Sequence, residues 1–500
     1  MHGLRVVKSA GIAAIVLYPI YVIPLSNTSD ARLHSSSSLA VYAFALIANL
    51  CLVTLAVASF WNLIYRTRFA QALRFLLFPG LVAVALQAVY FPHHLTISLP
   101  ILFSSFTLAL LFAMTLQRPF PAVYRRVQQL TETVPVGLGL YCIAVVIQLL
   151  LLAKWHPTPN DVEARAPNLT GESSTRPRVI WILMDELSYS QVFETRAAGL
   201  HLPNFDELRK SSTVFSDVQP VSEYTVTAVP SLMLGRPVQS VVYTADNQYL
   251  VAMGGGPPTK FPAAETPFAL AQSKGMTTGV AGWYNPYCTM LQPYLNRCYW
   301  INSTFFFTNF MEDDSFLQDV ANSWIWYWDF FRSPNDGVRE RQHRITEIQD
   351  IDRHARELLE DDQVDFVFVH LSIPHPPGIF DRRTDTFDLS RRLSYFDNLA
   401  LADKTLGQFI TTLRQSPRWS HTSVVINGDH SWRTFIWRKS RFWTPEEDQV
   451  APNSTFDPRP MLMVHQFGQT TPQVIGEPFP LIRVHDIVDS LIMGKQPNFH

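Results

Sequence analysis

Charged residues are scarce in this 500-residue chain: Asp, Glu, Lys and Arg make up 16% of it, against about 25% in ordinary soluble proteins, whereas 47% of the residues are hydrophobic. The shortage is local. Residues 1–155 contain 10 Lys/Arg and 2 Asp/Glu, so 12 in 155, and residues 156–500 contain the other 30 and 40, so 70 in 345. A membrane part therefore precedes a soluble part.

The soluble part also lacks any run of Lys or Arg, and its charges sum to 30 − 40 = −10. This absence excludes nucleic acid as a partner. Cysteine is equally scarce, with 4 in the whole chain. A soluble part of 345 residues buries a full core without crosslinks, which excludes a small disulfide scaffold and a disordered chain.

Five apolar runs predict a transmembrane domain of five helices over residues 1–153. The runs are Ala10–Leu25, Leu39–Tyr65, Phe75–Phe91, Leu95–Leu116 and Val134–Ala153. A membrane crossing needs about 20 apolar residues, so the first and third runs are short. The first run is either a cleaved signal peptide or a retained anchor, and we favour the anchor because no A-x-A-like site follows it.

Basic residues mark the cytoplasmic side of the membrane. They are Arg5 and Lys8 before the first run, Arg66, Arg68 and Arg74 after the second, and Arg118, Arg125 and Arg126 after the fourth. The two other loops contain only Arg32. Because basic loops stay inside, we expect the soluble part on the extracytoplasmic (periplasmic) side of the cytoplasmic (inner) membrane. That compartment is oxidising and predicts a disulfide between Cys288 and Cys298, with two free thiols as the alternative.

The soluble part has the pattern of an α/β domain with a mostly parallel sheet between helices. Residues 154–177 are polar and rich in proline and read as a linker, so this domain occupies 178–500. Its apolar runs are VIWILMD (179–185), TTGVAGW (277–283), FVFVHLS (366–372) and TSVVING (422–428), separated by helical patterns such as PNFDELRKS. Runs that are apolar on both faces are typical of buried parallel strands.

An aromatic stretch at residues 299–331 interrupts this pattern. It predicts either a helix at the level of the lipid headgroups or side chains that fill a core beside the sheet.

Side chains that bind metals follow three of the apolar runs. They are Asp185 and Glu186 after the first, His370 and His375 in and after the third, and Asp429 and His430 after the last. Sites in open α/β sheets lie at these carboxyl ends. Carboxylates with imidazole bind a divalent cation that activates an oxygen nucleophile, and mixed oxygen and nitrogen ligands favour zinc or manganese over calcium or magnesium. A helix cap and a surface turn are the alternatives for the acidic and DH pairs.

The nucleophile is expected in SEYTVTAVPSLMLGR (222–236). A threonine hydroxyl is a weak nucleophile unless a metal or a base lowers its pKa. Thr225 and Thr227 are the candidates, and the alternative role for either is to cap the following helix.

Together these motifs resemble the alkaline phosphatase/sulfatase superfamily, in particular the five-span membrane enzymes that transfer phosphoethanolamine or phosphoglycerol to lipids and glycans. The similarity runs from about Arg178 to Gly494 and rests on MDE, LPNFDEL with VF, the segment ending in LGR, TPFALAQSKGMTTGVAGW, HLSIPHP and INGDH.

The resemblance implies residue roles. In sulfatases and nucleotide pyrophosphatases the nucleophile precedes a glycine by ten residues; here 235 − 225 = 10, which selects Thr225 and a phospho-threonine intermediate. The implied metal ligands are Glu186, Thr225, Asp429 and His430, with Asp185 as a further ligand or a helix cap. Phosphoethanolamine transferases have two histidines separated by five, as here (375 − 370 = 5), so His370 and His375 are similar to substrate-phosphate or second-metal residues, and Arg433 is expected to face the phosphate.

The sequence also departs from the family. Sulfatases convert Cys or Ser to formylglycine, which Thr225 cannot become, and AGWYN (281–285) replaces their GKWH element. The histidine that follows DH in the phosphoethanolamine enzymes is missing. We therefore expect a monomeric membrane enzyme that moves a phosphoethanolamine- or phosphoglycerol-type group from a membrane lipid donor to a lipid or glycan acceptor. A sulfate- or phosphate-ester hydrolase is the alternative, and a non-catalytic assembly factor is a third reading.

Overall fold

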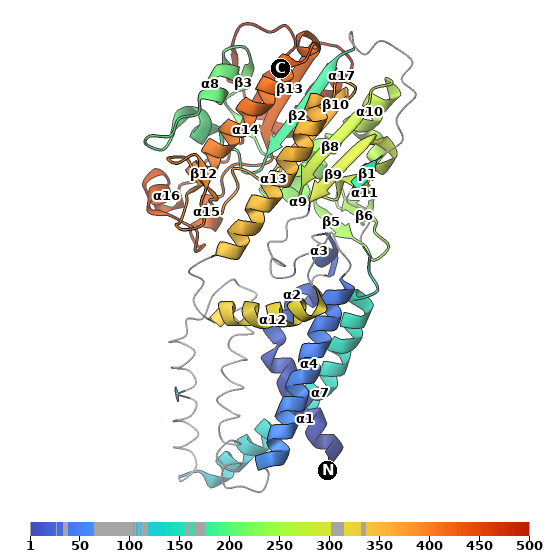
Figure 1. Ribbon diagram of the computed structural model, residues 1–500, viewed down its shortest axis with the longest axis vertical. Coiled ribbons are helices and arrows are strands. Elements are labelled where there is room, and N and C mark those ends of the chain that lie inside the picture. The colour runs from blue at the N-terminus through green and yellow to red at the C-terminus, as the bar shows by residue number, and fades with distance from the viewer. Residues whose placement is uncertain are drawn as a thin grey trace. The chain divides into compact units, whose positions relative to one another are not determined.

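The computed structural model describes residues 2–26, 28–33, 39–64, 119–156, 161–163, 176–301, 315–331 and 337–499, with the single positions 104, 107, 108 and 111 (Figure 1). The chain divides into two compact units. The helical unit contains Met1–Ala31, Ser37–Pro157 and Phe306–Asp336. The sheet unit contains Arg32–Ser36, Thr158–Phe305 and Gly337–His500.

The helical unit supports two of the five predicted spans. Its helices are α1 (His2–Val16), α2 (Tyr18–Ser26), α4 (Ala40–Ile64), α7 (Pro121–Leu152) and α12 (Phe316–Phe331), and α3 (Thr28–Leu33) follows α2. Within the described residues, Ala40–Leu63 and Thr133–Leu152 are long and apolar enough to cross a membrane. They coincide with the second and fifth predicted spans. The third and fourth lie outside the described residues apart from the four single positions.

The first predicted span is not one helix. It divides at Leu17 into α1, with 15 residues, and α2, with 9, and neither reaches the length of a membrane crossing. Pro19 is the reason: it lacks the backbone N–H that would continue α1, and it is accommodated in the first turn of a new helix. The run Ala10–Leu25 is therefore two helices separated at Leu17 and not one continuous helix.

The aromatic stretch is divided between the two units: residues 299–301 belong to the sheet strand β9 (Arg297–Ile301), whereas residues 316–331 form α12, which packs on α4 within the helical unit. The Trp324 indole N–H donates to Oδ1 of Asn49 at 2.7 Å, and the Asn49 amide donates to the Val320 carbonyl at 3.2 Å. Asn49 is completely buried. A polar side chain in the middle of an apolar helix thus finds both of its partners on α12.

The sheet unit is built on a nine-stranded sheet that is mostly parallel, as predicted. Its order is β1 (Asp161–Glu163), β9 (Arg297–Ile301), β8 (Thr278–Trp283), β10 (Phe366–Leu371), β2 (Arg178–Met184), β13 (Thr422–Gly428), β14 (Leu462–His465), β3 (Thr213–Phe215) and β15 (Gln473–Ile475). The five neighbours from β9 to β13 are all parallel, whereas β1 and β14 pair antiparallel. The edge strand β1 comes from the predicted linker.

Helices cover both faces of this sheet (Figure 1). On one face Ile180 and Ile182 pack in the core with α13 (Val338–Glu360) and α14 (Tyr395–Gln415). On the other, Trp181 meets Phe368, which in turn contacts Phe268 of α10 (Pro267–Ser273). All seven residues of β2 are buried, which explains why the six positions after Arg178 are all apolar.

Shorter elements surround this core. They are α8 (Pro203–Arg209), β4 (Val218–Gln219), α9 (Thr225–Leu234), β5 (Ser240–Tyr243), β6 (Tyr249–Ala252), β7 (Thr259–Lys260), α11 (Tyr287–Met290), β11 (Phe380–Asp381), β12 (Thr386–Phe387), α15 (Thr434–Trp437), α16 (Pro445–Val450), β16 (Phe479–Pro480) and α17 (Val484–Ile492).

The register of the central strands places the site. Met184 at the end of β2 pairs with Leu371 of β10 and with Gly428 of β13. The three strands therefore end level, and the residues that follow them emerge at one edge of the sheet.

Candidate metal centre and nucleophile

A sharp turn directly after β2 presents the first two acidic residues. Glu186 has φ 63°, a left-handed conformation that a residue with a side chain adopts at a cost. Two hydrogen bonds hold it: the Tyr395 hydroxyl donates to the Glu186 carbonyl at 2.7 Å, and the Glu186 N–H donates to Oδ1 of Asp429 at 3.2 Å. The turn therefore joins the ends of β2 and β13.

Asp185, Asp429 and His430 form a completely enclosed group whose ligand atoms lie within 4.8 Å of one another. His430 Nδ1 lies 3.1 Å from the Ser431 carbonyl and donates to it, which leaves the Nε2 lone pair facing Oδ2 of Asp429 at 3.2 Å and Oδ1 of Asp185 at 3.6 Å. Neither of these carboxylate oxygens has a hydrogen-bond partner among the described residues. Three electron-pair donors that converge without a proton between them fit a divalent cation.

The electrostatics of this group agree with a cation site. Burial raises the pKa of Asp185 well above its usual value, and the neighbouring charges of Asp429 and Glu186 raise it further. Burial lowers the pKa of His430 to about 3, and the charge of Arg433 adds to this effect. The imidazole is therefore neutral at ordinary pH, as a metal ligand must be, and the crowded carboxylates would be stabilised by positive charge.

The structure separates the two candidate threonines. Thr225 is the first residue of α9, and its Oγ1 lies 3.3 Å from Nε2 of His430 and 3.5 Å from Oδ2 of Asp185. Oγ1 of Thr227 instead lies 2.7 Å from the Ser222 hydroxyl. Thr225 alone of the two stands beside the cation site, where a hydroxyl can be activated.

The end of α9 explains the glycine that lies ten residues beyond Thr225. Gly235 ends the helix with φ 63°, and a Cβ there would come within 2.9 Å of the His485 ring. Both the left-handed turn and the close packing require glycine.

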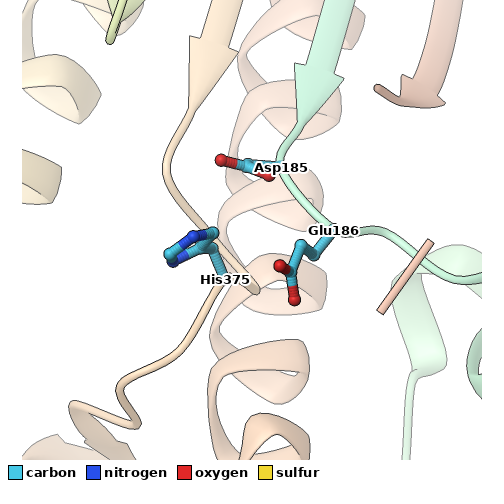
Figure 2. A group of neighbouring side chains, drawn as sticks. All are labelled: Asp185, Glu186 and His375. Carbon is cyan, nitrogen blue, oxygen red and sulfur yellow. The ribbon is translucent and has the colours of Figure 1, made fainter. Parts of the chain in front are cut away.

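Glu186 belongs to a second group, with Asp185 and His375, whose ligand atoms also lie within 4.8 Å of one another (Figure 2). The predicted grouping of Glu186 with Asp429 and His430 thus differs from the observed one, in which Asp185 is shared by both groups. The reason is geometric. Asp185 and Glu186 are consecutive residues in extended or turn backbone, so their side chains point to different sides.

Arg433 contacts this second group directly. It donates from Nε to Oε1 of Glu186 at 2.6 Å, and the Trp437 indole N–H donates to both oxygens of the same carboxylate at 2.9 and 2.8 Å. Arg433, which we expected to face the phosphate, is therefore paired with a carboxylate at the edge of the site. Our sequence reasoning missed Trp437, although it lies four residues after Arg433, the spacing of one helical turn.

His370 and His375 both contact Trp283. The centroid of the Trp283 ring lies 5.7 Å from that of His370 and 5.6 Å from that of His375. His370 Nδ1 lies 2.7 Å from the Tyr287 hydroxyl, and its Nε2 is buried without a hydrogen-bond partner among the described residues. Burial lowers the pKa of His370 to about 4, so the ring is neutral. His375 Nδ1 lies 3.2 Å from a guanidinium nitrogen of Arg344, a residue that no sequence motif marks.

The predicted disulfide is confirmed. Cys288 and Cys298 are bonded and link α11 to β9. Tyr287, the neighbour of Cys288, is the residue that orients His370. Its ring lies against Gly282 of β8, where a Cβ would come within 2.4 Å of it. The disulfide therefore anchors a segment that positions a histidine of the site.

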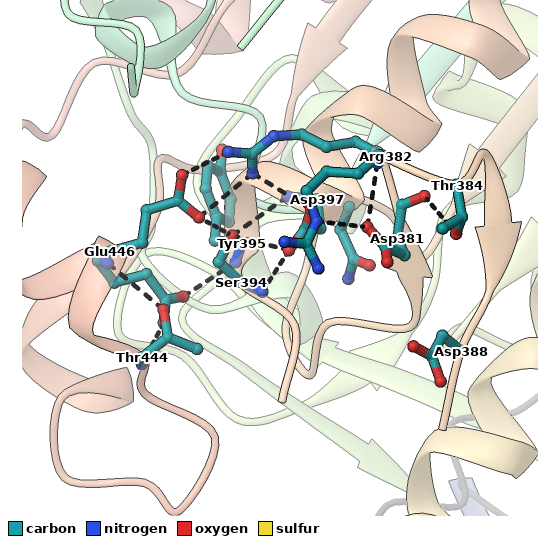
Figure 3. Close-up of polar contacts among 12 residues, drawn as sticks. Asp381, Arg382, Thr384, Asp388, Ser394, Tyr395, Asp397, Thr444 and Glu446 are labelled. Carbon is teal, nitrogen blue, oxygen red and sulfur yellow. Dashed lines mark hydrogen bonds and ion pairs between the residues drawn. The ribbon is translucent and has the colours of Figure 1, made fainter. Parts of the chain in front are cut away.

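A polar network around the starts of α14 and α16 supports the turn after β2 (Figure 3). Capping boxes begin both helices, Ser394 with Asp397 in α14 and Thr444 with Glu447 in α16. Oε1 of Glu447 accepts the N–H of Tyr395 at 2.9 Å, which joins the two helix starts. This network fixes the tyrosine whose hydroxyl holds the turn.

The chain belongs to the sulfatase family: the family model described as Sulfatase matches residues 177–449, more than half of the chain. This membership confirms the resemblance to the alkaline phosphatase/sulfatase superfamily. None of the curated proteins matches the sequence.

Several solved structures are similar to this chain at low identity. The lipoteichoic acid synthase LtaP from Listeria monocytogenes is 15% identical with a TM-score of 0.39, covering 67% of this chain and 76% of its own. The sulfatase PsFucS1 from Pseudoalteromonas sp. is 13% identical with a TM-score of 0.42, covering 65% and 69%. The phosphonate monoester hydrolase of Agrobacterium radiobacter is 14% identical with a TM-score of 0.38, covering 64% and 74%.

Proposed function

We propose that this chain is a membrane-anchored, metal-dependent transferase that moves a phosphoethanolamine- or phosphoglycerol-type group from a lipid donor to an envelope lipid or glycan. The observation that carries the proposal is the Thr225 hydroxyl beside the group of Asp185, Asp429 and His430. A threonine hydroxyl forms a phosphate ester but not the formylglycine of sulfatases. Transfer through a phospho-threonine therefore fits this site better than sulfate-ester hydrolysis.

In the proposed reaction, Oγ1 of Thr225 attacks the phosphorus of the donor phosphodiester, and the bond from phosphorus to the lipid oxygen breaks. The proton of the Thr225 hydroxyl is transferred to the lipid oxygen, so that the lipid departs as an alcohol. An acceptor hydroxyl then attacks the phospho-threonine, breaks its ester bond and restores Thr225. A divalent ion held by Asp185, Asp429 and His430 would supply charge stabilisation at the nonbridging oxygens, and zinc and manganese are the ions we favour.

Membership of the sulfatase family favours a second candidate, the hydrolysis of sulfate or phosphate esters at the same site. Water would then replace the acceptor. The two functions differ in their product, because a transferase leaves the phosphate on a new alcohol and a hydrolase releases it.

The proposal includes five membrane crossings and an extracytoplasmic sheet unit, in a chain that acts as a monomer. Large apolar side chains on the two long helices support membrane anchoring, since Leu55 and Leu63 of α4 are 63% and 81% exposed and Leu151 of α7 is 60% exposed. A core helix of a soluble protein would bury such residues. An alkaline-phosphatase-type reporter, which is active only outside the cytoplasm, should be active when fused after Ala153 and inactive when fused after Arg126; the reverse pattern would overturn the orientation.

The function is tested with the full chain purified in detergent, loaded with zinc or manganese and incubated with bacterial membrane lipids. Intact mass should reveal a phosphate-containing group on the wild-type chain and none on Thr225→Ala. When a lipid or glycan acceptor is added, the chain should lose the phosphate-containing group and the mass of the acceptor should increase by the mass of that group. Release of inorganic sulfate from aryl sulfates, with no group carried on Thr225, would establish the hydrolase instead.

A further inference from the structure

Arg344 reaches the site from α13, an element that none of the metal-binding residues belongs to. Its guanidinium carbon lies 4.6 Å from the centroid of the Trp283 ring, and its Nη2 lies 3.2 Å from Nδ1 of His375. Nδ1 of His375 donates to the Pro376 carbonyl at 2.5 Å, so it does not accept a hydrogen bond from this Nη2. The side chain is only 6% exposed. A buried guanidinium stacked on an indole and directed at a site histidine is held in one orientation.

Glu347, the carboxylate partner of Arg344, contacts the guanidinium only at Nη1, so the guanidinium can also bind another anion. Nη1 lies 3.4 Å from Oε2 of Glu347, a long contact, while the other oxygen of Glu347 lies 3.0 Å from Nε2 of His343. Arg433, by contrast, contacts Glu186 at 2.6 and 2.5 Å. Arg344 thus makes the weaker ion pair of the two arginines.

The charges around the site show what Arg344 changes. Four buried carboxylates either belong to the two metal-binding groups or pair with Arg344, namely Asp185, Glu186, Asp429 and Glu347, and they contribute −4 when ionised. Arg344 and Arg433 contribute +2, so one divalent cation makes the group neutral. Without Arg344 the loaded group would carry −1 and would repel a phosphodiester, which is itself an anion. Electrostatic repulsion of this kind weakens the binding of an anionic substrate.

We propose that Arg344 is an anion-binding residue of this site, which donates to a nonbridging oxygen of the phosphate group next to His375. This inference rests on the proposed function for the identity of the substrate. A guanidinium presents parallel N–H groups that match the oxygens of a tetrahedral anion. Arg344 therefore provides, from α13, a positive charge at the substrate, in a chain in which AGWYN replaces the lysine-containing element of the sulfatases.

The test is equilibrium binding of inorganic phosphate to the full metal-loaded chain, measured by calorimetry so that turnover is not needed. Arg344→Gln should weaken phosphate binding at least tenfold with metal content unchanged. Arg353→Gln is the matched control, because Arg353 lies on the same helix, is 56% exposed and pairs with Asp350. It should bind phosphate like the wild type.

Arg344→Lys keeps the charge and the alkyl chain but not the planar fork, so it tests the proposal even if Arg344→Gln does not fold. We expect it to weaken phosphate binding about three- to tenfold at an unchanged melting temperature. Wild-type phosphate affinity in Arg344→Lys, or in a folded Arg344→Gln, would overturn the proposal and leave Arg344 a structural residue. Inorganic sulfate is measured in parallel: dependence on Arg344 for sulfate alone would support this residue's role while contradicting the proposed transferase.

Discussion

Oγ1 of Thr225 lies 3.3 Å from Nε2 of His430, and the other ring nitrogen of that histidine lies 3.1 Å from a backbone carbonyl. The backbone contact fixes the tautomer in which Nε2 carries a lone pair. The hydroxyl therefore faces a lone pair and, at 3.5 Å, the Asp185 carboxylate. This arrangement is suited to a hydroxyl that loses its proton as it reacts.

Thr225→Ala should reduce turnover of a generic phosphodiester by at least a thousandfold and leave the melting temperature within a few degrees of the wild type. Thr227→Ala is the matched control, and it should retain most of the activity because its hydroxyl contacts Ser222 outside the cation site. Activity is measured with bis(p-nitrophenyl) phosphate. If the losses are reversed between the two variants, the assignment of the nucleophile to Thr225 is wrong.

Asp429→Asn should release the metal. Its two carboxylate oxygens have separate tasks, since Oδ1 accepts the N–H groups of Glu186 and His430 and Oδ2 faces the cation site. The amide oxygen of Asn can still accept the two backbone N–H groups, but the side chain loses the negative charge that binds the cation. We therefore expect metal affinity to fall by roughly tenfold to a hundredfold or more. Metal content after dialysis is the measurement, with exposed Asp448→Asn as the control. Full metal content in Asp429→Asn would contradict the site.

Glu447 predicts a pH dependence of stability. Burial raises its pKa from the usual 4.5 to about 7, so the folded sheet unit binds this proton more tightly than the unfolded chain. The resulting stabilisation is complete below pH 4.5 and is lost as the pH rises through 7; it amounts to at most about 3 kcal/mol. Glu447→Gln imitates the protonated acid. The free energy of unfolding of Glu447→Gln, relative to that of the wild type, should therefore increase between pH 5 and pH 8. A constant difference between the two proteins over this range would disprove the prediction.

Replacing Cys288 and Cys298 with serine should lower the free energy of unfolding by about 2–4 kcal/mol, because the disulfide closes a short loop. We also expect weaker phosphate binding, since the loop carries the tyrosine that orients His370. Denaturant unfolding of the double variant and of the reduced wild type measures the first effect. Equal stabilities of the oxidised wild type and the double variant would show that the disulfide does not stabilise the fold.

Local patterns in the sequence were sufficient for four central strands of the sheet (β2, β8, β10 and β13), the disulfide and the residues at the strand ends. A buried parallel strand is centred on consecutive apolar residues and ends where acidic residues begin, so VIWILMD and TSVVING located β2 and β13 within one residue. The two cysteines of the soluble part have few alternatives to pairing with each other. These features depend on neighbours in the chain, and such neighbours are visible in a sequence.

The pairing of side chains across the site depended on tertiary structure. The sequence could not show that Asp185 rather than Glu186 joins Asp429 and His430, because that choice follows from a left-handed turn held by Tyr395. It could not show that α12 packs on α4, because the aromatic stretch is equally suitable for two environments. Arg344 lies 31 residues before His375 in the chain, and only the packing of α13 against the sheet brings the two side chains together. Local propensity selects elements, whereas long-range packing decides which side chains meet.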